Sequence, residues 1–183
     1  MFYRELTNND VDDVTDLLIE AYYPYDGLVA CVPMTKEELY TYANTNAKIM
    51  IPMGLSIGAY DAENKLCGVS LSLYSTWEYD ELPVSDKYDI LSRFEEWCEL
   101  CLNEEFGTDN FLIDDIVAVA PHCNDRGIGT ELLKRKEQMA IDRGFDFIVG
   151  FAVSEKNMRI LAKLGYECLK KLDLLSYKDP VTR

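Results

Sequence analysis

The stretch IVAVAPHCNDRGIGTELL, residues 116–133, decides which fold this chain of 183 residues adopts. Its apolar, β-branched start ends at Pro121, a residue that cannot continue the hydrogen-bond ladder of a central strand. A polar turn follows, and a Gly-x-Gly then opens a segment with helical spacing. We therefore predict a strand over 111–120 and a helix over 127–143.

Strand and helix patterns continue on both sides without repeats, low-complexity tracts or flexible linkers, so we expect one domain over residues 1–183. Capping boxes that begin at Thr7 and Thr35 indicate two helix starts. The predicted strands are 2–6, 54–60, 66–75, 111–120, 145–153 and 166–177, and the predicted helices are 11–21, 35–48, 85–102, 127–143 and 154–165. This element order predicts an α/β sheet.

The start of the helix predicted at 127–143 is suited to an anion. The first N–H groups of a helix have no partner within it, and the helix dipole adds partial positive charge there. Gly127 and Gly129 would let phosphate oxygens approach the backbone. Thr130 offers a hydroxyl and Arg126 a positive charge. The pattern is neither a Walker A loop nor a dinucleotide fingerprint, and a plain strand-to-helix turn remains the alternative.

The same residues resemble motif A of the GCN5-related N-acetyltransferases, a Val-x-Pro followed by Arg/Gln-Gly-x-Gly-x-Gly/Ala. The matching positions are Val119, Pro121, Gly127, Ile128 and Gly129. Asn124 stands where the family prefers Arg or Gln, and Asp125 stands where it often has Gly. An aspartate beside a diphosphate weakens binding unless its carboxylate turns away or pairs with Arg126.

A second block, NMRILAKLGY at residues 157–166, resembles in part the family's Asn-x-x-Ala-x-x-x-Tyr-x-x-x-Gly-Phe pattern, with Asn157 and Gly165 in place. Leu161 falls near the position of a tyrosine that often acts as general acid in the superfamily, and leucine cannot donate a proton. The resemblance implies a mixed, mostly antiparallel sheet that is flanked by helices and contains a splayed central strand pair.

The resemblance also implies acetyl-CoA as co-substrate. In the family, free amides of the strand before the loop hold the pantetheine arm and the acyl oxygen, and here these amides would belong to Val117 and Val119. The cofactor-binding residues implied in this way are Val117, Val119, Asn124, Asp125, Arg126, Gly127, Gly129, Thr130 and Asn157.

Acetyl transfer to an amine needs a base, because an alkylammonium with a pKa near that of lysine, about 10.4, must lose a proton before it attacks. Asp115 is one candidate catalytic residue, since it shares a strand face with Val117 and Val119; it could instead be a solvated or capping acid. Asp26 is the other. Its segment AYYPYDGL, residues 21–28, resembles the Phe-Phe-x-Asp-Glu-Pro-Leu segment of insect-type arylalkylamine N-acyltransferases, although it could equally be a simple turn.

The tyrosines of that segment are expected to line an amine pocket. Tyr22, Tyr23 and Tyr25 could stack on an aromatic ring or attract an ammonium group, and their alternative role is the edge of the core.

Composition narrows the partners. A formal charge of −15 and an isoelectric point near 4.4 disfavour nucleic acid, which is bound through clustered Lys and Arg. The same charge suits a cationic small molecule or a basic peptide, or it serves only solubility. Without a signal pattern or a run of roughly 18 apolar residues, we expect a cytoplasmic protein with no membrane partner. Its six cysteines are then expected to be free thiols and, with His122 as the one histidine, no metal site is expected.

The sequence thus predicts an N-acetyltransferase in which a primary amine, of small arylalkylamine type, attacks acetyl-CoA directly with the help of a general base. Two alternatives stay open. One is a protein or peptide N-acetyltransferase, and the other is an inactive CoA-binding module, which the differences at Asn124, Asp125 and Leu161 suggest. A monomer or a homodimer is expected.

Overall fold

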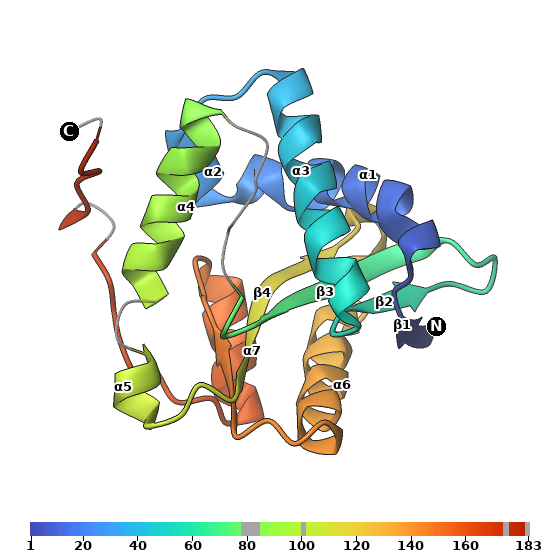
Figure 1. Cartoon of the computed structure of the whole chain (residues 1–183). Helices are drawn as coiled ribbons and strands as arrows, with labels where there is room; N and C mark the ends of the chain where they lie inside the picture. The colour runs from blue at the N-terminus through green and yellow to red at the C-terminus, as the bar shows by residue number, and fades with distance from the viewer. Residues whose placement is uncertain (78–84, 100–101, 174–175, 182–183) are drawn as a thin grey trace.

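The computed structural model describes residues 1–77, 85–99, 102–173 and 176–181. In this part of the chain five strands form one sheet in the order β1-β2-β3-β4-β5 (Figure 1). The strands are β1 (Phe2–Glu5), β2 (Ile57–Tyr60), β3 (Leu66–Tyr74), β4 (Phe111–Val119) and β5 (Phe147–Gly150). Neighbours from β1 to β4 pair antiparallel, and β5 pairs parallel with β4. The sheet is mixed and mostly antiparallel, as predicted.

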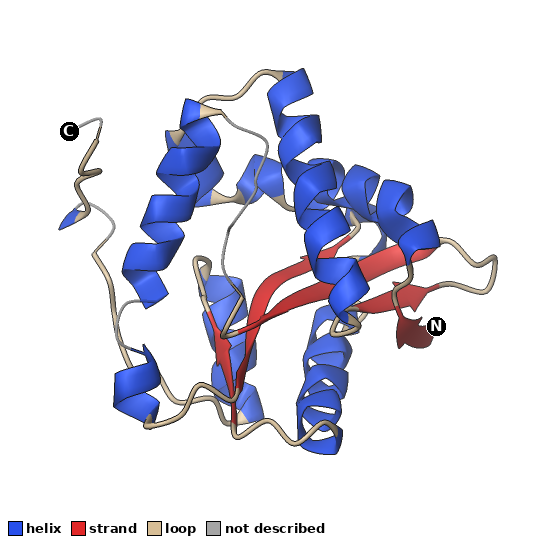
Figure 2. Ribbon diagram, in the orientation of Figure 1, coloured by secondary structure: helices blue, strands red, loops and turns tan. Residues whose placement is uncertain are grey.

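Helices cover both faces of this sheet. They are α1 (Val11–Ala21), α2 (Gly27–Cys31), α3 (Lys36–Met50), α4 (Asp86–Glu99), α5 (Leu102–Phe106), α6 (Ile128–Asp142) and α7 (Glu155–Leu164), with 3-10 turns η1 (Asn8–Asp10), η2 (Tyr23–Tyr25), η3 (Ile51–Met53) and η4 (Pro121–Cys123). α1 and α3 pack on one face, while α6 and α7 lie on the other (Figures 1 and 2). α4 and α5 lie beside the sheet, near the C-terminal segment.

Both predicted capping boxes are present. The hydroxyl of Thr35 accepts from the N–H of Glu38 at 3.2 Å, and the carboxylate of Glu38 accepts from the N–H of Thr35 at 2.7 Å. In the first box, the Asp10 carboxylate accepts from the N–H and the hydroxyl of Thr7, at 2.7 and 2.8 Å. The same carboxylate accepts from Arg4 of β1 and Tyr60 of β2. This cluster therefore ties two strands to the start of α1.

A bulge interrupts β4 at Asp115. Ile116 pairs with Leu71 of β3, but Asp114 pairs with Ser72, so Asp115 is an extra residue without a counterpart on β3. Bulges of this kind re-aim a side chain, and they are common next to active sites. Asp115 is half-buried, whereas its neighbours on both sides are buried.

β4 and β5 are splayed. β5 pairs with the first four residues of β4, 111–114, and ends at Gly150, while β4 continues to Val119. The N–H of Ala120 donates to the carbonyl oxygen of Cys67 on the β3 side at 2.9 Å. Because successive N–H groups of a strand alternate in direction, those of Val117 and Val119 point to the opposite side, into the splay.

A lysine lies inside the core below the sheet. Lys136 of α6 is 0% exposed, and its ammonium donates to the backbone oxygens of Leu55 and Ser70. Burial lowers the pKa of Lys136 to about 8, although attraction to Asp114 opposes that shift. Burial raises the pKa of Asp114, whose carboxylate accepts from the hydroxyls of Ser70 and Ser72 at 2.7 and 3.2 Å.

The last predicted strand, 166–177, is wrong. Residues 166–173 and 176–177 form no strand, and residues 174–175 lie outside the described part of the chain. Tyr177 packs instead against α4, with its ring centre 5.0 Å from that of Phe94 and 5.3 Å from that of Trp97. Arg93 of α4 pairs with Asp179 at 2.8 Å. Tyr177, the last residue of the predicted strand, therefore packs on a helix, and residues 167–171 are exposed.

Other predicted boundaries shift for local reasons. The strand predicted from 54 begins at Ile57, because Gly54, at φ +69°, ends the turn η3 first. The strand predicted over 145–153 is the shorter β5. Of the helix predicted over 85–102, the structure describes α4 up to Glu99 and Leu102 at the start of α5, and residues 100–101 lie outside the described part of the chain. The loop 22–33 contains η2 and the short helix α2.

Within the described ranges, no helix combines the length and the apolar character needed to cross a membrane.

Candidate active site

α6 begins at a glycine without a side-chain cap. Gly127 occupies the N-cap position at φ +75°, and no described side chain caps the helix there. Nothing lies within 4 Å of the place where a Cβ on Gly127 would stand. The N–H of Glu131 makes the first bond of the helix, to the oxygen of Gly127. The N–H groups of Ile128, Gly129 and Thr130 thus precede the helical ladder, and a ligand can approach them.

The acidic residue of the loop before α6, Asp125, lies near basic side chains. Asp125 adopts φ +60°, and its carboxylate is 89% exposed and lies 3.5 Å from Nζ of Lys156 on α7. The carboxylate thus pairs with Lys156 across the loop, a partner that sequence reasoning missed because it considered Arg126 alone. Asn124 and Arg126 are exposed. Lys156 of α7 thus offsets the charge of Asp125, and Arg126 adds a positive charge beside the start of α6.

Close packing of α6 against the sheet depends on Gly68 of β3. A Cβ on Gly68 would lie 3.0 Å from the backbone oxygen of Ala118 and 3.1 Å from Cγ2 of Ile128. A Cβ on Gly129 would lie 3.7 Å from Cγ2 of Val119, an ordinary contact. Gly68, and not Gly129, is therefore the glycine that allows α6 to pack closely on the sheet. The sequence alone did not indicate this role of Gly68.

A cavity of about 730 Å³ adjoins the splay of β4 and β5. Both candidate bases, Asp26 and Asp115, line it, and so do Ile116 of β4 and residues 148–150 of β5. Further walls come from η2, α2, α3, α4, α5 and α7 and from residues 166–172 of the C-terminal segment, which include Lys170 and Lys171. Apolar side chains supply most of the lining, including Val29, Met50, Leu91, Phe94, Phe151, Met158 and Leu161.

Among the described residues, four carboxylates line this mainly apolar space: Asp26, Glu95, Asp115 and, from the C-terminal segment, Glu167. Asp26 is 6% exposed, and its Oδ1 accepts from the N–H of Val29 at 3.2 Å, so it caps α2 as well as lining the cavity. Asp115 lies at the bulge of β4. The third carboxylate, Glu95 of α4, accepts from the hydroxyl of Tyr42 at 3.5 Å. Sequence reasoning missed Glu95 because a single acid on an amphipathic helix gives no signal of what it faces.

Two of the three tyrosines expected in the pocket are there. Tyr22 and Tyr23 line the cavity, whereas Tyr25 is 78% exposed and lies outside the lining. Burial raises the pKa of Tyr22 well above its ordinary value, and the negative charges of Asp26 and Asp115 raise it further. Tyr22 therefore stays protonated beside both candidate bases and can donate a hydrogen bond.

The second sequence block, residues 157–166, forms most of α7 and the two residues after it. The first turn of α7 contains Asn157, whose N–H donates to the hydroxyl of the N-cap Ser154 at 3.2 Å. Leu161 lines the cavity as an apolar group. Tyr166, just after the helix, brings a phenol to the same cavity.

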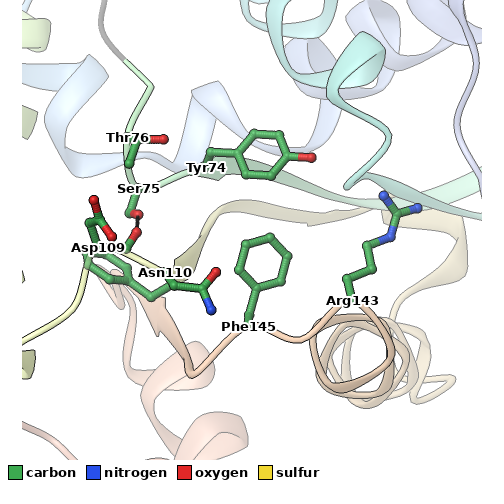
Figure 3. Close-up of a pocket in the computed structure, with 8 residues that line it drawn as sticks. Tyr74, Ser75, Thr76, Asp109, Asn110, Arg143 and Phe145 are labelled. Carbon is green, nitrogen blue, oxygen red and sulfur yellow. Dashed lines mark hydrogen bonds between the residues drawn. The ribbon is translucent and has the colours of Figure 1, made fainter.

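A smaller cavity of about 280 Å³ lies at the other end of β3 and β4 (Figure 3). Tyr74, Asn110, Arg143 and Phe145 are among its walls, and the guanidinium of Arg143 pairs with Glu5 at 2.8 Å. None of the predicted site residues lines it.

A mixed sheet with a splayed strand pair, followed by an open helix N-terminus, is the fold of the GCN5-related N-acetyltransferases, and this chain has it. The mosquito arylalkylamine N-acetyltransferase like 5b is similar, with a TM-score of 0.79 and 22% identity over 98% of this chain and 89% of that one. The C-terminal condensation domain of Ebony, solved with β-alanyl-dopamine, gives a TM-score of 0.80 at 18% identity, over 98% and 88%.

The polyamine N-acetyltransferase of Drosophila melanogaster, which forms N-acetylagmatine, gives a TM-score of 0.74 at 17% identity, over 98% of this chain and 88% of that one. No protein-family model and no curated protein matches the sequence. At these identities the likeness establishes the fold, and the activity must be argued from the site.

Proposed function

We propose that this protein transfers an acetyl group from acetyl-CoA to the amino group of a small molecule with an apolar or aromatic body. The observation that carries the proposal is the combination of three features in one fold: the uncapped start of α6, the splay beside β4, and a mainly apolar cavity that carboxylates line. The similar proteins add support, because arylalkylamine, agmatine and β-alanyl-dopamine all contain or derive from an amine.

The donor set at α6 fits a diphosphate. The N–H groups of Ile128, Gly129 and Thr130 would bind its oxygens, with the hydroxyl of Thr130 and the charges of Arg126 and Lys156 beside them. Asn124, Asp125, Gly127 and Asn157 would form the rim of this site. When bound, acetyl-CoA supplies an activated thioester. The N–H groups of Val117 and Val119 would orient its pantetheine arm and acyl oxygen.

The cavity favours a small amine over a peptide. Its volume of about 730 Å³ lies within the range of roughly 300–1,000 Å³ that is typical of small-molecule pockets. Tyr22 and the apolar walls suit a ring or an alkyl chain, while Asp26, Glu95 and Asp115 attract an ammonium group. The net charge of −15 adds long-range attraction for cations.

Asp26 and Asp115 are the candidate general bases, acting directly or through a water molecule. Asp26 already caps α2, whereas the bulge directs Asp115 to the splay itself, so Asp115 is the favoured base and Asp26 the favoured anchor for the ammonium group. Tyr22, protonated beside both, would hold Asp26 in position by donating a hydrogen bond to its carboxylate.

Two measurements test the function. Saturating acetyl-CoA should raise the melting temperature, because a ligand selective for the native state stabilises it. Acetyl transfer should then be seen with arylethylamines or agmatine and not with lysine peptides. Binding without transfer to any amine would indicate the CoA-binding module, transfer to lysine peptides would indicate the protein acetyltransferase, and no binding at all would refute the whole proposal.

Variants separate the roles of the carboxylates. Asp115→Asn should lower kcat/KM by about 10²–10⁴-fold near neutral pH, and the deficit should shrink at high pH, where the amine is already neutral. Glu95→Gln should raise KM for the amine, whereas Glu96→Gln, an exposed neighbour on α4, should leave it unchanged. A wild-type pH profile for Asp115→Asn would remove Asp115 from the mechanism.

A further inference from the structure

Two cysteines and the histidine converge at the junction between β4 and α6. One ligand atom each from Cys67, His122 and Cys123 lies within 4.8 Å of the other two. Both cysteines are buried and His122 is exposed. No sequence motif signals this cluster, because His122 and Cys123 are adjacent while Cys67 lies on a distant strand.

The local structure directs these three side chains to one point. Ala59 of β2 pairs with Gly68 and Tyr60 pairs with Leu66, so Cys67 is an extra, bulged residue on β3. On the other side, η4 carries His122 and Cys123, and the N–H of Cys123 donates to the oxygen of Ala120 at 2.8 Å. Ala120 itself donates to the oxygen of Cys67. The backbone therefore fixes the turn against the bulge without the side chains.

We propose that Cys67, His122 and Cys123 bind a zinc-class divalent cation. Two thiolates and an imidazole are the donors that Zn²⁺ prefers, and three protein ligands leave a fourth position for water. With Zn–S bonds of about 2.3 Å, tetrahedral sulfur atoms lie about 3.8 Å apart, so side-chain rotations that shorten the separation by about 1 Å suffice. The exposure of His122 places the fourth position toward solvent.

The alternative is a pair of thiols that serves only the core. Burial raises the pKa of Cys67 to about 11, and a hydrogen bond with Cys123 contributes to this rise. A bound cation reverses that preference, since a coordinating thiol loses its proton. A thiol pair explains the two cysteines, but it gives no reason for an imidazole at the same point.

The site would brace the loop that leads into α6. η4 ends at Cys123, and the loop 124–127 follows at once. A cation that joins η4 to β3 would therefore anchor the start of this loop to the sheet, in addition to the backbone bonds already present.

Cobalt is the probe for the test, because thiolate ligands give Co²⁺ an intense charge-transfer absorption and Zn²⁺ then displaces it. The full chain, without a histidine tag, is stripped of metal, reduced with a phosphine and titrated with Co²⁺. We expect a 1:1 complex that Zn²⁺ abolishes. Cys67→Ser and Cys123→Ser should lose the absorption. His122→Ala, at an exposed position that does not endanger folding, should weaken Co²⁺ binding by at least about 10-fold.

Cys31→Ser and Cys168→Ser are the matched controls, since both residues are exposed cysteines away from the cluster, and they should bind Co²⁺ like the wild type. Absence of the charge-transfer band in the wild type would overturn the proposal. So would wild-type affinity in His122→Ala, or equal losses in the two controls.

Discussion

Asp10→Asn should be among the most destabilising conservative substitutions in this chain. The Asp10 carboxylate is 5% exposed and accepts five hydrogen bonds, two from the Arg4 guanidinium at 2.9 and 2.7 Å, two from Thr7 and one from the Tyr60 hydroxyl. Asparagine keeps the shape but removes the charge, and one of its two polar atoms cannot accept. Breaking a buried ion pair costs about 3–5 kcal/mol.

The lower end of that range applies, because the Arg4 side chain is 37% exposed and water can solvate it once the carboxylate is lost. We therefore expect a loss of about 3 kcal/mol in the free energy of unfolding. For a chain of this length the melting temperature should fall by about 6–12 °C. Urea denaturation at pH 7 measures the change as a lower midpoint at an unchanged m-value.

The pH dependence gives a second readout. The Arg4 guanidinium holds the pKa of Asp10 well below its usual range. The contribution of Asp10 is therefore complete above its unfolded pKa of about 3.9 and is lost as the pH falls toward the folded value. The difference between wild type and Asp10→Asn should shrink when both are unfolded at pH 3. The control, Asp16→Asn, changes an exposed carboxylate of α1 and should stay within about 0.5 kcal/mol. A loss for Asp10→Asn as small as that of the control, or parallel pH profiles, would refute the reasoning.

Two further changes probe the support of α6. Gly68→Ala should cost about 1–3 kcal/mol, because the new Cβ would lie 3.0 Å from the backbone oxygen of Ala118, whereas Gly27→Ala meets no atom within 4 Å and should be nearly neutral by urea denaturation. The folded pKa of Lys136, about 8, lies below its unfolded value of about 10.4, so the unfolded chain binds more protons between these values and stability should rise with pH there. Lys136→Met should remove that slope and the exposed Lys134→Met should keep it; equal slopes in the two variants would contradict the assignment.

Local signals in the sequence predicted most of the secondary structure. β4 ends at Val119, just before Pro121, because proline has no N–H for the strand ladder. α6 ends just before Gly144, because glycine readily adopts the positive φ that terminates a helix. The capping boxes at Thr7 and Thr35 held for the same reason: a side chain satisfies N–H groups that are only a few residues away. The prediction failed at 166–177, where an apolar pattern alone could not tell a sheet from a helix as its packing partner.

The helix start at Gly127 follows from local sequence, since backbone freedom and unpaired amides are properties of a few consecutive residues. Tertiary structure alone decided which distant groups meet. It brought Glu95 to the same cavity as Asp26 and Asp115, Lys156 to Asp125, and Cys67 to His122. Bulges in β3 and β4 re-aim two of these side chains, and a bulge depends on how neighbouring strands pair, which no single stretch of sequence encodes.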